Sequence, residues 1–279
     1  MSAVTQHLLL AGERTATQLC ELGVRRGGVL LVHASMRSVG EDAGRVADAL
    51  CRVLGPEGTL AVPTFTPENS DTSRSHQDHV RGLSDEAREA VRAAMPAFDP
   101  AVTPAPSMGA LSETVRLTPG ARRSAHPQTS FAALGPGAQK LLADHRQDCH
   151  LGEDSPLARL YEADAQILLL GTGFDSCTAF HLAEYRLPSP PRRVYRCVVS
   201  SEGGRRWWEY EDIALDDSDF AALGNDFVRT RTGATGNVAV GTGTVGIGRV
   251  GAARSHLFPL RAAVDFAAGW LAKHRAGGC

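Results

Sequence analysis

The stretch Ile167–Tyr185, ILLLGTGFDSCTAFHLAEY, decides the fold. It begins with four apolar residues and stops at Gly171-Thr172-Gly173. A short unbroken apolar run before glycines predicts a strand that is buried on both faces, as in a largely parallel sheet. Residues Thr178–Tyr185 then have the pattern of the first turns of a helix. Because open α/β sheets place their chemistry in loops at the carboxyl ends of such strands, we expect a site here.

Two side chains on the predicted helix are candidates for this chemistry. His181 and Glu184 are three residues apart, so they share one face of a helix. A neutral histidine beside a carboxylate is suited to act as a general base for an amine or a hydroxyl. The alternative is structural: the histidine caps a neighbouring element and the glutamate faces water. The pair alone does not decide between these interpretations.

A strand–helix–strand unit precedes this stretch. Val29–Val32 and Thr59–Pro63 are short apolar runs, and Gly44–Leu54 between them repeats apolar residues at helical spacing. That order predicts two parallel strands. From Val194 the sequence alternates instead, and Glu202-Gly203-Gly204 predicts the turn of an antiparallel pair. We therefore expect an α/β fold with a mixed central sheet, flanking helices and a small antiparallel subdomain.

Small and hydroxyl residues follow the first two strands. The segment His33–Gly40 (HASMRSVG) could bring backbone N–H groups close to a phosphate or an extended ligand, although an ordinary strand-to-helix connection has the same composition. Thr64–Asn69 leaves the next strand at the same edge of the sheet. Residues Arg122–His126 make a candidate anion-binding rim, with solvated surface arginines as the alternative.

The remaining segments are polar or rich in glycine. Residues of about 70–106 are polar, contain four prolines at 96, 100, 104 and 106 and have a helical centre at Ser84–Ala94, which predicts an insertion or lid. The acidic cluster at 209–219 could bind a polycation, but solvated loops have the same pattern. A GxGxxG motif occupies 241–246, but no clear helix follows it, so we predict turns between short strands rather than a dinucleotide site.

Composition excludes several classes of protein. The chain has 279 residues, 22% charged and 43% hydrophobic, which is typical of a folded soluble protein. The net charge of −2 gives no general attraction to nucleic acid. The N-terminus lacks the pattern of a signal peptide and no apolar run has membrane-spanning length. The six cysteines form no CxxC pair, and the histidines lack zinc-site spacing. We expect a cytoplasmic enzyme with reduced thiols, no metal, no membrane contact and no nucleic acid partner.

Several stretches together resemble the aminoglycoside 3-N-acetyltransferase family, also called the antibiotic N-acetyltransferases. They are LLVHASMRSVG (Leu30–Gly40), LGPEGTLAVPTFT (Leu54–Thr66), MGALSETVRLTPGARRSAHPQTSFAALGP (Met108–Pro136), DSPLARLYEADAQILLLGTGFDSCTAFHLAEY (Asp154–Tyr185) and GTVGIGRVGAARSHLF near the C-terminus. The similarity follows the family's order over nearly the whole chain. It implies one acetyltransferase domain over 1–279, with a lid-like insertion at about 70–106 and an antiparallel substrate-side part at about 190–222.

The resemblance implies a reaction and catalytic roles. The reaction is transfer of an acetyl group from acetyl-CoA to the 3-amino group of an aminoglycoside, which confers antibiotic resistance. In the family the histidine that matches His181 is the general base. The resemblance makes Asp212 or Glu211 the carboxylate that orients this imidazole, and gives Glu184 a role in holding substrate or structure. Thr178 is expected to donate a hydrogen bond to the thioester carbonyl.

The resemblance also implies two binding surfaces. The expected coenzyme A contacts are His33, Ser35, Met36, Arg37, Ser38, Val39, Gly40, Thr64, Arg123, Ser124 and His126. A polycationic aminoglycoside needs convergent carboxylates, and the expected substrate contacts are Glu68, Asn69, Asp175, Glu184, Glu211 and Asp212. The chain departs from the family at Phe174, where relatives commonly have histidine in a substrate-side loop. The enzyme is expected to be a monomer or a homodimer.

Two other functions are compatible with the sequence. One is CoA-dependent N-acetylation of a non-antibiotic biosynthetic amine on the same fold. The other is a non-catalytic module that sequesters a cationic ligand, but the presence of His181 and of the Ser35–Gly40 loop as the family has them counts against it. An α/β-hydrolase is disfavoured because the chain has no GxSxG motif.

Overall fold

A seven-stranded mixed sheet forms the centre of the protein, and its strand order is β3-β4-β2-β1-β5-β9-β8. The computed structural model describes residues 3–231 and 245–275. The strands of this sheet are β1 (Val29–Ala34), β2 (Thr59–Pro63), β3 (Arg122–Arg123), β4 (Phe131–Leu134), β5 (Gln166–Leu170), β8 (Gly246–Val250) and β9 (Ala253–Pro259). A separate antiparallel pair is made by β6 (Arg192–Ser201) and β7 (Gly204–Ile213). The predicted fold class, a mixed central sheet with a small antiparallel part, is confirmed.

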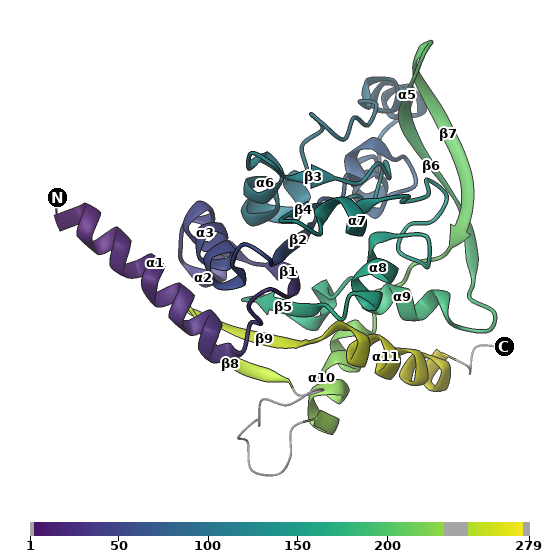
Figure 1. The fold of residues 1–279 in the computed structure, drawn as a ribbon. Coiled ribbons are helices and arrows are strands. Elements are labelled where there is room, and N and C mark those ends of the chain that lie inside the picture. The colour runs from purple at the N-terminus through teal and green to yellow at the C-terminus, as the bar shows by residue number, and fades with distance from the viewer. Residues whose placement is uncertain (1–2, 232–244, 276–279) are drawn as a thin grey trace.

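Helices surround this sheet (Figure 1). The α-helices are α1 (Ala3–Leu22), α2 (Met36–Val39), α3 (Ala43–Leu54), α4 (Arg74–His79), α5 (Asp85–Ala94), α6 (Gly109–Leu117), α7 (Ala138–Leu142), α8 (Pro156–Glu162), α9 (Phe180–Tyr185), α10 (Phe220–Arg231) and α11 (Leu260–Arg275). Short 3₁₀ turns are η1 (Pro67–Asn69), η2 (Pro106–Met108) and η3 (Phe174–Ser176).

The central strands are buried on both faces, as their apolar runs predict. Leu31 and Ile167 belong to a core shared with α7 to α11, whereas their chain neighbours Leu30 and Leu168 belong to a core shared with α1, α3 and α6. Successive residues of a strand point to opposite faces, so unbroken apolar runs suit strands covered on both sides.

Strand direction fixes the position of the site. β1 pairs in parallel with β2 on one side and with β5 on the other, and β4 and β9 flank these three strands in antiparallel orientation. The chain therefore adds β2 on one side of β1 and later adds β5 on the other side, so the strand order changes direction at β1. Ligands of open α/β sheets bind outside the carboxyl ends of strands at such a point. The loops that follow β1 and β5 meet there.

Gly171 is required where these two loops meet. Its φ is +68°, a region that favours glycine. A Cβ on Gly171 would also lie 2.8 Å from the Ala253 Cβ and 3.0 Å from the Ser38 Cβ. The glycine therefore lets the β5 exit pack directly against α2 and β9.

The polar segment of about 70–106 packs against the β6–β7 hairpin (Figure 1). Phe98 pairs with Val199 at an isolated β-bridge, and the backbone N–H of Phe98 donates to the Val198 carbonyl at 3.1 Å. Arg205 on β7 donates to the backbone carbonyls of Met95 at 2.8 Å and Arg92 at 2.6 Å. The segment is thus joined to the hairpin by backbone contacts as well as side chains.

The sequence predicts turns between short strands at the glycine-rich motif near the C-terminus. The GxGxxG motif lies mostly outside the described residues; its last residue, Gly246, begins strand β8 rather than a helix.

Candidate active site

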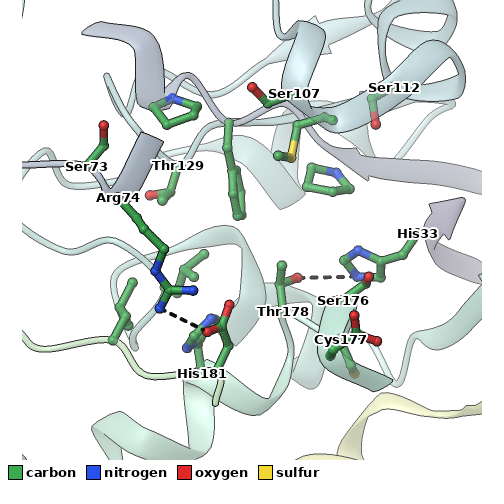
Figure 2. Close-up of a pocket in the computed structure, with 18 of the residues that line it drawn as sticks. His33, Ser73, Arg74, Ser107, Ser112, Thr129, Ser176, Cys177, Thr178 and His181 are labelled. Atoms are coloured by element: carbon green, nitrogen blue, oxygen red, sulfur yellow. Dashed lines mark hydrogen bonds and ion pairs between the residues drawn. The ribbon is translucent and has the colours of Figure 1, made fainter. Parts of the chain in front are cut away.

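A cavity of about 530 Å³ lies beside the carboxyl ends of β1, β2 and β5 (Figure 2). His33 lines it from the end of β1, Pro63 from the end of β2, and Thr172 and residues 175–178 from the loop after β5. His181 lines it from α9, and the opposite wall includes residues of α4, η2 and the β6–β7 hairpin. Four of the residues predicted to form the site, His33, Asp175, Thr178 and His181, therefore share one cavity.

His181 and Glu184 form a hydrogen-bonded pair at the floor of this cavity. The Nδ1 of His181 lies 2.5 Å from Oε2 of Glu184, as the spacing of three residues on one helix face predicts. The imidazole packs on the Phe220 ring, with centroids 4.7 Å apart, and its side chain is 12% exposed. Among the described residues no protein group bonds to Nε2 of His181. With Nδ1 bonded to the carboxylate, Nε2 is left to accept a proton from a ligand in the cavity.

Hydrogen-bond donors to the second carboxylate oxygen, Oε1, hold Glu184 in place. Its side chain is 3% exposed, and Oε1 accepts from the backbone N–H of Asp216 at 3.1 Å and from the Arg275 guanidinium. Arg275 also forms an ion pair with Asp219 and donates to the backbone carbonyl of Asp216 at 2.7 Å. A buried carboxylate needs such partners to stay charged. The C-terminal helix α11 thereby fixes the orientation of the His181–Glu184 pair.

Asp212 does not contact His181, which corrects the prediction that Asp212 or Glu211 orients the imidazole. Oδ2 of Asp212 accepts from the backbone N–H of His150 at 2.8 Å and from the Tyr185 hydroxyl at 2.5 Å. Burial alone would raise the pKa of Asp212, but hydrogen bonds from His150 and Tyr185 outweigh it and lower the pKa. Glu211 is exposed and pairs with Arg192 on the hairpin. Adjacent strand residues point to opposite faces, and the partners found on the two faces are His150 and Tyr185 for Asp212 and Arg192 for Glu211, not His181.

Thr178 lies between the two histidines of the cavity (Figure 2). Its hydroxyl oxygen is 3.3 Å from Nε2 of His33 at the end of β1. Burial lowers the pKa of His33 to about 4, so this imidazole is neutral near neutral pH. A hydroxyl held by a neutral imidazole can donate to an oxygen that gains negative charge.

The segment 33–40 begins at the cavity wall, where His33 and Ala34 line it. Ser35 caps α2, with its hydroxyl oxygen 2.9 Å from that of Ser38, and Gly40 ends the helix in the left-handed conformation. Arg37 and Ser38 are exposed, whereas Val39 is buried in the core. Arg37, Ser38 and Gly40 are therefore accessible to an extended ligand, and Val39 serves packing.

The other predicted coenzyme A contacts bond within the protein, which corrects the prediction of an anion-binding rim. Arg123 is partly buried, and each of its three guanidinium nitrogens donates internally, to the Thr64 and Ser130 hydroxyls and to the Thr64 and Thr103 carbonyls. Ser124 is 2% exposed and bonds to His145, and His126 is 0% exposed. Thr64 is also fully buried.

Two of the predicted substrate contacts, and the position that differs from the family, do not line the cavity. The Asn69 amide is buried and donates to the Pro127 and Val198 carbonyls. Glu68 is exposed and accepts from Ser107, whose residue lines the cavity. Phe174, the position that differs from the family, lies in the core beside Phe258, with ring centroids 5.6 Å apart.

Four carboxylate or guanidinium side chains line the cavity, namely Arg74, Arg193, Asp175 and Asp217. Only Asp175 was predicted as a site residue. Asp217 belongs to the acidic cluster at 209–219, so the composition of that segment indicated a possible binding residue. The sequence around Arg74 indicated no site, because a single arginine in a polar insertion resembles any solvated residue. The lining thus balances two carboxylates against two guanidiniums.

We predict that acid destabilises the fold, because the protein buries several histidines. Burial lowers the pKa of His145 to about 4 and holds that of His126 well below its ordinary value. The unfolded chain binds these protons near pH 6.5, whereas folded His145 binds its proton only near pH 4, so acid favours unfolding between these values. For His145 this amounts to on the order of 3 kcal/mol once pH has fallen to its folded pKa.

Urea unfolding at several pH values tests this prediction. We expect the urea midpoint to fall steadily from about pH 7 to about pH 5. A midpoint that is constant or higher in acid would show that these histidines are already charged in the folded protein.

Among the described residues no helix is long and apolar enough to cross a membrane. Within the same ranges, no group of three or more His, Cys, Asp or Glu side chains could hold a metal ion.

Comparison with known proteins identifies relatives over almost the whole chain. The family model described as aminoglycoside 3-N-acetyltransferase matches residues 31–272. The SPbeta prophage-derived aminoglycoside N(3')-acetyltransferase-like protein YokD of Bacillus subtilis (strain 168) is 38% identical over 254 residues, covering 90% of this chain and 88% of YokD. Aminoglycoside N(3)-acetyltransferase IX of Micromonospora chalcea is 36% identical over 269 residues, covering 92% of each chain.

Solved structures give the same result. The structure described as AAC-IIIb binary with CoASH has a TM-score of 0.77 at 30% identity, covering 94% of this chain and 96% of that one. AAC-VIa bound to sisomicin has a TM-score of 0.75 at 31% identity, covering 93% of this chain and 96% of that one. The matched order of segments, the shared fold and the identity over most of the length agree: this chain belongs to the aminoglycoside 3-N-acetyltransferase family.

Proposed function

We propose that this protein transfers the acetyl group of acetyl-CoA to the 3-amino group of an aminoglycoside and so confers resistance to the antibiotic. The observation that carries the proposal is the His181–Glu184 pair, whose imidazole lines a cavity at the switch point of the sheet. The names of the relatives, and the coenzyme A and sisomicin held by two of them, support the choice of both substrates.

His181 acts as the general base in this proposal. Acetyl-CoA supplies the acetyl group as an activated thioester. As the neutral 3-amino group forms a bond to the carbonyl carbon, Nε2 of His181 takes the proton that the nitrogen loses. Glu184 accepts the hydrogen bond from Nδ1–H and stabilises the imidazolium that results. The carbon–sulfur bond then breaks, and the coenzyme A thiolate leaves and takes up a proton.

Thr178 stabilises the charge that develops on the thioester oxygen. Its hydroxyl lies on the same side of the cavity as His33 and is partly exposed. A positioned donor at a developing oxyanion contributes transition-state stabilisation that water cannot supply without reorganising.

We place coenzyme A along segment 33–40, which starts at the cavity wall with His33 and Ala34. The accessible groups there are Arg37, Ser38 and the backbone at Gly40, and the cavity continues from Ala34 to Ser107, Met108 and Ser112 of the facing segment. A guanidinium, hydroxyls and an apolar thioether suit phosphates at one end and an uncharged pantetheine arm at the other. The insertion at about 70–106 and the hairpin then form the acceptor side of the cleft. We place the reaction in the cytoplasm, and every group it requires comes from one chain, so a monomer or a homodimer would be competent.

Thiol release from acetyl-CoA tests the proposed function. Gentamicin, kanamycin and apramycin are offered separately, beside a buffer blank, and coenzyme A binding is measured by calorimetry. Release with any of the three antibiotics supports the proposal. If coenzyme A binds but none of the three is acetylated, the aminoglycoside assignment fails. If coenzyme A does not bind, the acetyltransferase assignment fails as well.

A second candidate function is favoured by the charge of the cavity. Two guanidiniums among its lining residues suit an acceptor that carries fewer ammonium groups than an antibiotic, such as a biosynthetic amino sugar. Glucosamine is therefore added to the panel. If the enzyme acetylates glucosamine but none of the three antibiotics, the function belongs to this second class.

A further inference from the structure

An arginine from the insertion reaches over the catalytic pair. Arg74 is the first residue of α4, and its guanidinium lies 3.5 Å from the Asp217 carboxylate. Figure 2 shows Arg74 extending from its helix toward His181. Arg74 and Asp217 both line the cavity, so their ion pair stands in the space through which an acceptor approaches His181.

The position of Asp217 is tied to the catalytic pair. Its chain neighbour Asp216 donates its backbone N–H to Glu184 at 3.1 Å and accepts from Arg275 at 2.7 Å. The loop after β7 is therefore anchored to the carboxylate that holds His181. An ammonium group bound to Asp217 would be held beside the general base.

The Arg74 guanidinium is held weakly in comparison with Arg193. Arg193 donates to the Thr72 carbonyl at 2.7 Å and stacks on Tyr195 at 4.6 Å. The contact found for Arg74 within the described part of the chain is the single ion pair with Asp217, in which the side chains are 78% and 46% exposed. Exposed pairs of this kind contribute about 0.2–1 kcal/mol. An incoming cation can therefore displace Arg74 from Asp217 at little cost.

We propose that Arg74 is a tethered competitor for the acceptor: its guanidinium occupies the ammonium subsite at Asp217 and so determines how tightly cationic amines bind. This inference rests on the proposed function for the identity of the acceptor. Binding of an acceptor ammonium to Asp217 releases Arg74, which remains nearby and repels further positive charge. The residue thus weakens binding most for acceptors with several ammonium groups.

Calorimetric titration of gentamicin into the coenzyme A complex tests the inference without requiring turnover. We expect Arg74→Gln to lower the Kd about 2- to 5-fold, the equivalent of one exposed ion pair. We expect Asp217→Asn to raise the Kd, and the double variant Arg74→Gln/Asp217→Asn to bind no more tightly than Asp217→Asn alone. Added salt should reduce the effect of Arg74→Gln.

Arg81→Gln is the matched control. Arg81 comes from the same insertion, is exposed and pairs with Asp78, but it does not line the cavity. Its replacement should leave the Kd unchanged, whereas a general effect of net charge would lower the Kd in both variants equally. Equal shifts, or an unchanged or higher Kd in Arg74→Gln, would overturn the inference.

The outcome separates this inference from the proposed function. Wild-type protein that binds gentamicin but acetylates none of the three antibiotics would refute the proposed function, and the Arg74 comparison would still be decided. If Arg74→Gln binds gentamicin and wild-type protein does not, the inference is supported. If neither wild-type protein nor Arg74→Gln binds gentamicin, the inference is overturned.

Discussion

Replacement of His181 by alanine is expected to lower kcat about 10³-fold while coenzyme A binding remains within a few-fold of wild type. The proton of the attacking amine then has no acceptor at Nε2, and general base catalysis of this kind contributes roughly 10²–10⁴-fold. His181 is only 12% exposed in its side chain, but it packs at the cavity wall and not in the centre of the core, so we expect the variant to fold. Stopped-flow thiol release gives kcat, and calorimetry gives the coenzyme A affinity.

His79→Ala is the matched control for this variant. His79 is exposed at the end of α4 and does not line the cavity. Its replacement should leave kcat unchanged. If the His181→Ala protein is folded and retains more than about a tenth of wild-type kcat, His181 is not the general base.

Replacement of Glu184 by glutamine is expected to lower kcat about 10²-fold or more, with the KM for acetyl-CoA little changed. An amide cannot stabilise the imidazolium as a carboxylate does, and it can turn its NH₂ toward Nδ1 and favour the wrong tautomer. The Arg275 guanidinium also loses the charged partner on Oε1. Steady-state kinetics separate kcat from KM, and urea unfolding reports the stability of the variant.

Asp212→Asn provides the comparison that decides between the two carboxylates. Asp212 is as buried as Glu184, but its partners are His150 and Tyr185. We expect Asp212→Asn to lower the free energy of unfolding by about 1–3 kcal/mol, because buried polar groups lose an acceptor. Its kcat should stay within a few-fold of wild type. A larger loss of kcat in Asp212→Asn than in Glu184→Gln would restore the role that the resemblance gave to Asp212.

Local sequence patterns predicted those parts of the molecule that depend on local interactions. The apolar runs at Val29–Val32, Thr59–Pro63 and Ile167–Leu170 became strands covered on both faces. Ser155 caps α8 ahead of Pro156, as the preference of these residue types predicts. The His181–Glu184 contact followed from helix geometry alone, since residues three apart share a face.

Contacts between distant segments were not predictable in this way. Arg123 was expected at a surface rim, but its partners Thr64 and Thr103 come from the segment directly after β2 and from the end of the insertion. Asp212 was expected beside His181 because it lies on an acidic strand, but strand alternation and the hairpin's position direct it to His150. The Arg74–Asp217 pair joins α4 to the loop after β7, and neither segment has a pattern that indicates the other.

The structure of the acetylated product tests the central claim most directly. Wild-type protein is incubated with acetyl-CoA and gentamicin, and the product is analysed by NMR beside a parallel incubation with His181→Ala. The account predicts a single acetyl group on the 3-amino nitrogen, formed at the rate of thiol release and nearly absent with His181→Ala. Acetylation at another nitrogen, or a product that forms equally with His181→Ala, would contradict it.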